Sequence, residues 1–168
     1  MEKISRQQVL DIVSSSMMAS HTYWKQAVVY KPLSALIHIT TAHYLSIDEP
    51  NILLSKESQQ IVDAFSAGSD EFIVFKTYAD PERKAIVNDF VQLPEYAYLQ
   101  DKWNQIADAL LAQWQPWAID DFFIDVEEAW KSYRIERFRQ EIEQVLAVHS
   151  IDLDTLCIYP LVSIEQDS

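Results

Sequence analysis

Glycine is almost absent from this chain. Its 168 residues include a single glycine, Gly68, where average usage near 7% would supply about twelve. Loops that bring the backbone against a phosphate, or that hold a nucleophile on a strained turn, need several glycines close together. The scarcity therefore excludes the P-loop, the dinucleotide-binding fingerprint, the glycine-rich kinase loop and the nucleophile elbow.

Cysteines and long apolar runs are also scarce. The one cysteine, Cys157, has no partner for an internal disulfide, which agrees with a reducing compartment. No apolar run approaches the roughly 18 residues of a membrane span. The first residues, MEKISRQQVLD, lack the apolar core of a secretory signal. We therefore expect a cytoplasmic protein that makes no contact with a membrane.

Basic residues are few, and their distribution is uneven. The chain has 13 Lys and Arg against 26 Asp and Glu, for a formal charge of −13. Residues 1–56 carry a net charge of +1, and residues 57–168, with 22 acids and 8 bases, carry −14. A surface of this sign repels a phosphate backbone. We expect no direct binding of nucleic acid, and a basic protein is the favoured class of partner.

The length and the apolar patterning predict a mainly α-helical protein. At 168 residues and 49% hydrophobic composition, the chain suits one globular domain over residues 1–168. Apolar side chains recur at helical spacing in six segments, 5–19, 33–45, 55–67, 80–92, 94–114 and about 116–149. We predict a single-domain bundle of six or seven helices. Minor β structure is expected at most, with candidate short strands near residues 72–78 and 156–164.

Two details refine these expectations. Gly68 follows the third predicted helix, where a residue with left-handed backbone is common. The apolar register drifts along the segment 116–149, which predicts a bend or a change of packing partner midway.

Motifs for catalysis or metal binding are missing from the sequence. None of the four histidines belongs to a Glu-x-x-His or His-Glu-x-x-His motif. His38 and His43 would point about 140° apart on a helix. Asp121, Asp125 and Glu128 fall on one helix face, but one helix supplies too few ligands for a cation. We predict no catalytic residue, no metal ligand and no cofactor, and we favour a protein without enzymatic activity.

The most informative feature of the sequence is a group of aromatic residues bordered by acids. Aromatic side chains can anchor a protein partner, and carboxylates can steer a basic one toward the same surface. The residues predicted to form this partner-binding surface are Trp114, Trp117, Asp120, Asp121, Phe122, Asp125 and Glu128.

The leading hypothesis is a non-catalytic acidic module that binds or neutralises a basic protein, as immunity proteins, inhibitors and some chaperones do. One alternative is a small-molecule sensor or enzyme with a pocket between helices, lined by aromatic residues and by His38 or His43. Another is a mimic of nucleic acid. A third is a homodimer or larger homo-oligomer in which Lys131, Arg134, Arg137 and Arg139 pair with the acidic tail of a second chain.

Overall fold

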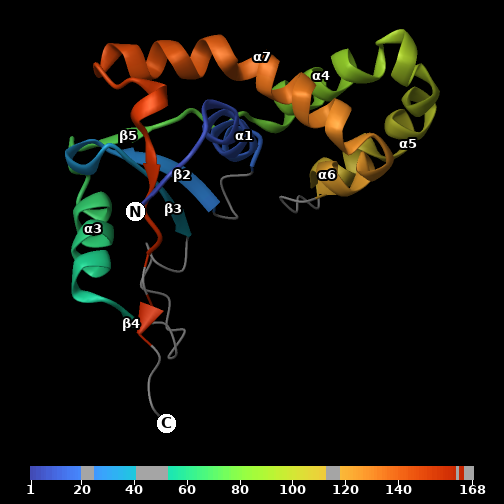
Figure 1. Cartoon of the computed structure of the whole chain (residues 1–168). Coiled ribbons are helices and arrows are strands. Elements are labelled where there is room, and N and C mark those ends of the chain that lie inside the picture. Colours follow the sequence, from blue (N-terminus) through green and yellow to red (C-terminus); the bar gives the residue numbers. More distant parts are fainter. Residues whose placement is uncertain (20–24, 41–52, 113–117, 162, 165–168) are drawn as a thin grey trace.

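A computed structural model describes residues 1–19, 25–40, 53–112, 118–161 and 163–164 (Figure 1). These residues contain six α-helices: α1 (Arg6–Met17), α3 (Lys56–Ser66), α4 (Asp80–Val91), α5 (Gln100–Ala112), α6 (Ala118–Phe122) and α7 (Glu127–Val148). They also contain four 3-10 segments: η1 (Lys31–Leu33), η2 (Pro94–Leu99), η3 (Ile124–Val126) and η4 (Leu153–Thr155). The expectation of a mainly helical protein is confirmed.

The described residues also form a mixed β-sheet, which is larger than the short strands expected from the sequence. Its order is β1-β6-β3-β2-β5. The strands are β1 (Glu2–Lys3), β2 (Lys25–Tyr30), β3 (Ala35–Thr40), β5 (Phe72–Val74) and β6 (Cys157–Ile158). A separate pair joins β4 (Leu53–Leu54) to β7 (Ser163–Ile164). The predicted strand regions 72–78 and 156–164 therefore do contain strands.

The predicted helix over residues 33–45 is wrong where the structure describes it. Residues 35–40 form β3, which pairs antiparallel with β2 and places Val28 opposite Ile37. Ser34 has a left-handed backbone (φ 45°, ψ 47°) and turns the chain between η1 and β3. Both faces of β3 are covered, so its sequence is a nearly continuous apolar run and not an alternating one. Residues 41–45 lie outside the described residues.

The sheet is covered by one helix on each face. Ala27, Val29 and Leu36 belong to the same buried cluster as Val9, Leu10 and Val13 of α1. Val28, Ile37 and Ile39 pack on the other side with Ile61 of α3. In Figure 1, α7 lies above α1, and α3 lies on the far side of the sheet from α1. A single helical bundle is not confirmed, because α1 and α3 pack against strands.

The second half of the chain surrounds an aromatic core. The ring centroids of Phe90 and Phe123 are 5.0 Å apart, and Trp130 lies 4.9 Å from Phe123 and 5.3 Å from Phe90. The predicted helix 116–149 is interrupted, where described, at the buried Phe123, which separates α6 from η3 and α7. The break lies near the start of the predicted helix and not midway, because α7 runs without interruption from Glu127 to Val148.

Gly68 has the left-handed conformation predicted for it, with φ 76°. Its N–H donates to the carbonyl of Phe65 at 3.0 Å, and Ser69 N–H donates to Ala64 at 3.1 Å. These bonds satisfy carbonyls at the end of α3. No helix among the described residues has the length and apolar character needed to cross a membrane.

Candidate functional site

The predicted partner-binding residues are divided between the surface and the interior. Trp114 and Trp117 lie outside the described residues. Asp121, Asp125 and Glu128 are exposed. Phe122 is only partly exposed, with its ring 4.9 Å from Phe123 and 5.7 Å from Trp103. Phe122 thus belongs largely to the aromatic core.

Four exposed carboxylates lie between residues 121 and 128. Asp121, Asp125, Glu127 and Glu128 are all exposed, and no Lys or Arg among the described residues lies within ion-pair distance of them. Ile124 lies among them in the sequence, with 65% of its surface exposed. We call these four acids and Ile124 the acidic face.

Asp120 differs from its neighbours because it is part of an ion-pair network. Its Oδ1 accepts a hydrogen bond from Trp130 Nε1 at 3.1 Å and lies 3.5 Å from a guanidinium nitrogen of Arg134. The carboxylate therefore fixes α6 against α7. Its role in the described structure is to position these elements.

Arg134 is the centre of that network. Its side chain is only 6% exposed, and its guanidinium forms an ion pair with Asp11 of α1 as well as with Asp120. Arg134 Nε also donates to Ser14 Oγ at 3.1 Å. Lys131 Nζ lies 3.3 Å from the second oxygen of Asp11. A buried cation needs such partners, since desolvation of an unpaired charge is costly.

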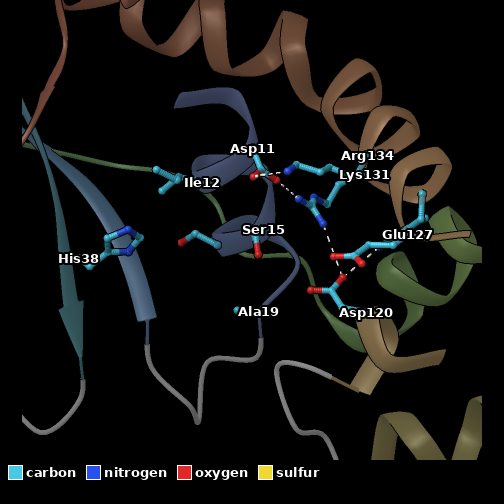
Figure 2. A pocket seen from close by; sticks show the side chains of 11 residues that line it. Asp11, Ile12, Ser15, Ala19, His38, Asp120, Glu127, Lys131 and Arg134 are labelled. Atoms are coloured by element: carbon cyan, nitrogen blue, oxygen red, sulfur yellow. Dashed lines mark hydrogen bonds and ion pairs between the residues drawn. The ribbon is translucent and has the colours of Figure 1, made fainter. Parts of the chain in front are cut away.

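A cleft of about 400 Å³ lies beside this network (Figure 2). Figure 2 shows His38 entering it from β3, Ile12 and Ser15 from α1, and Glu127 and Lys131 from α7. The complete lining is Asp11, Ile12, Ser15, Ser16, Ala19, His38, Asp120, Glu127, Trp130, Lys131 and Arg134. Sequence reasoning named His38 as a pocket residue in one alternative, but it did not predict that α1 and α7 would form the opposite wall.

A second cleft of about 400 Å³ lies between α4 and α7. Tyr78 donates its hydroxyl to Glu141, and its ring centroid lies 5.1 Å from that of Phe138. Burial, and then the hydrogen bond to Glu141, raise the pKa of Tyr78 above its ordinary value. Burial also raises the pKa of Tyr133, which lies on α7. Both phenols remain neutral at physiological pH.

The charged groups of these regions determine which ligands they can attract. Among the described residues, no group of three His, Cys, Asp or Glu side chains is arranged to hold a metal ion. The carboxylates of the acidic face are open to solvent, and the cations of the first cleft already have acidic partners. The acidic face and the first cleft therefore both offer charge complementarity to an incoming cation.

Comparison of the chain with known protein families, curated proteins and solved structures finds no match.

Proposed function

We propose that the protein binds a basic protein partner through its acidic face and does not act as an enzyme. The observation that supports this most is the absence, among the described residues, of a cationic partner for Asp121, Asp125, Glu127 and Glu128. Four like charges within eight residues repel one another. A basic partner would relieve that repulsion on binding.

Ile124 supplies the apolar contact that such an interface needs. Charged residues at the rim of an interface mainly increase the rate of encounter, whereas buried apolar anchors supply affinity. Ile124 is 65% exposed and lies within four residues of Asp121, Asp125 and Glu128 in the sequence. One exposed apolar residue flanked in the sequence by acids suits a partner that presents an apolar side chain among lysines or arginines.

The acidic face is built on a firmly held part of the fold. Phe123, fully buried, precedes Ile124 and packs against Phe90 and Trp130. Asp120, directly before Asp121, accepts the hydrogen bond from Trp130 and pairs with Arg134. A surface fixed in this way loses little conformational entropy on binding. We place this interaction in the cytoplasm, in line with the free thiol of Cys157.

The experiment uses two variants with the same net charge. Asp121→Lys/Asp125→Lys alters the acidic face, and Asp70→Lys/Glu71→Lys alters two exposed acids between α3 and β5. Each raises the formal charge of −13 by four. Wild type and both variants are used to capture proteins from the native host, and the captured proteins are identified by mass spectrometry.

A basic protein retained by wild type and by Asp70→Lys/Glu71→Lys, but lost with Asp121→Lys/Asp125→Lys, is the expected result. Equal loss with both variants would mean that only overall charge matters. Retention by Asp121→Lys/Asp125→Lys, or capture of no basic protein by wild type, would also contradict the proposal.

A further inference from the structure

We propose that the cleft between α1, β3 and α7 binds a small organic cation, an alkylammonium or alkylguanidinium group carried on a short carbon chain. The cleft has a volume of about 400 Å³, within the range of ordinary ligand sites. The ligand proposed for this cleft is a small molecule, whereas the acidic face is proposed to bind a protein. Only Glu127 belongs to both.

The cations that line the cleft are already neutralised. The guanidinium of Arg134 contacts Asp11, Asp120 and Ser14. Lys131 pairs with Asp11, whose two oxygens thereby face two different cations. An anionic ligand would have to displace one of these carboxylates, because the charges that would attract it are in use.

Hydrogen-bond acceptors, by contrast, remain available. Asp120 uses Oδ1 for both Trp130 and Arg134, and no donor among the described residues contacts its Oδ2. Glu127 has no ion-pair or hydrogen-bond partner within the same part of the chain, and both carboxylates line the cleft. In Figure 2 their oxygen atoms are turned toward its interior. A ligand that donates several hydrogen bonds and carries positive charge matches these acceptors.

The balance of charge in the lining favours the same class of ligand. Asp11, Asp120 and Glu127 contribute three negative charges, and Lys131 and Arg134 contribute two positive ones. These five side chains together carry a net charge of −1 before a ligand binds. A singly charged cation brings the site to neutrality, whereas a dicarboxylate would meet three like charges.

The remaining walls suit a short carbon chain. Ile12 of α1 and Ala19, two residues after the end of that helix, provide apolar surface beside the carboxylates. Ser15, which is exposed on α1, adds one hydroxyl group that can either donate or accept. Methylene groups can therefore lie along the walls while the charged end reaches Asp120 and Glu127.

The test is a calorimetric titration of the intact protein with n-butylguanidinium, which carries a single guanidinium on a four-carbon chain. A salt concentration of about 0.1 M reduces nonspecific attraction to the acidic surface. Glu127→Gln removes a carboxylate that lines the cleft, and Glu128→Gln removes the neighbouring exposed carboxylate outside its lining. Succinate serves as the anionic comparison.

We expect n-butylguanidinium to bind wild type and Glu128→Gln alike, with a dissociation constant on the order of 1 mM or lower, and succinate not to bind. Glu127→Gln should weaken binding by about tenfold, as expected for loss of a charge-assisted hydrogen bond. Ser15→Phe, which fills the cleft without changing its charge, should abolish binding. The proposal is overturned if wild type gives no binding, if both glutamine variants weaken it equally, or if Ser15→Phe binds as wild type does. None of these results depends on a protein partner.

Discussion

Arg134 shows how one buried charge can organise this structure. Its guanidinium connects α1, α6 and α7 through Asp11, Ser14 and Asp120. Removal of such a group leaves its acidic partners without a counter-ion in a poorly solvated place. Asp11 and Asp120 keep 29% and 51% of their side-chain surface exposed, so water can compensate part of that cost.

We predict that Arg134→Met lowers the free energy of unfolding by about 2 kcal/mol, below the 3–5 kcal/mol typical of a fully buried pair. The control is Arg139→Met on the same helix, where the arginine is exposed and pairs with Glu136. That change should cost less than about 0.5 kcal/mol. Urea unfolding measures both, and equal effects of the two substitutions would contradict the role given to Arg134.

Tyr78 gives the protein a sensitivity to alkaline pH. Its pKa is raised in the folded state, chiefly by burial and then by Glu141. The folded chain therefore keeps the phenolic proton to higher pH than the unfolded chain does. The resulting stability is fully present below about pH 10, the ordinary tyrosine value, and is lost as pH rises toward the folded pKa.

We predict that Tyr78→Phe costs about 1 kcal/mol at neutral pH, the usual worth of one hydrogen bond, and reduces the loss of stability above about pH 10. Urea unfolding at several pH values measures this. Tyr98→Phe, which alters an exposed tyrosine, should leave the alkaline loss unchanged. An identical pH profile for wild type and Tyr78→Phe would show that Tyr78 is not the group responsible.

At the scale of elements, helix boundaries could be predicted where the chain carries its own capping groups. Ser5 accepts from Gln8 N–H, and Gln8 accepts from Ser5 N–H, so α1 starts one residue after its expected cap. Ser55 caps α3 through a single bond, in which its hydroxyl oxygen accepts from Ser58 N–H. These signals are local, and a single sequence is enough to detect them.

Elements determined by tertiary packing could not be predicted. The apolar residues of β3 fit a buried helix equally well, and only pairing with β2 and burial on both faces decides for a strand. The break at Phe123 arises because that ring packs into the aromatic core. The first cleft joins Asp11, His38 and Arg134, which are far apart in the sequence and share no periodic pattern.

The end of α7 offers a prediction about backbone conformation. Ser150 follows the helix with φ 57°, and Ile151 N–H donates to Leu146 at 3.0 Å. This is the position at which glycine is favoured. Ser150→Gly should stabilise the protein by about 0.5 kcal/mol, because relief of the left-handed strain exceeds the added entropy of the unfolded chain.

Ser132 provides the matched comparison, since it is exposed and lies inside the same helix. Ser132→Gly should destabilise by about 0.5 kcal/mol through lower helix propensity. Thermal unfolding measures the two variants side by side. Destabilisation by both substitutions would refute the expectation for Ser150.

For the whole molecule, the distribution of charge matters more than its total. All four cations on α7 have acidic partners among the described residues: Lys131 and Arg134 pair with Asp11, Arg137 lies 3.8 Å from Asp89, and Arg139 pairs with Glu136. The acids at the start of the same helix have no such partners. The sequence predicted Asp121, Asp125 and Glu128 as surface residues, but only the structure separates them from Asp120, which is held by Arg134 and Trp130.

The central claim is that the acidic face steers a basic partner, and the most direct test is the association rate constant of the captured partner at low salt. We predict that Asp121→Lys/Asp125→Lys slows association by about tenfold relative to Asp70→Lys/Glu71→Lys, and that the difference shrinks near 0.15 M salt as screening increases. Equal association rate constants for these two variants at low salt would contradict the account.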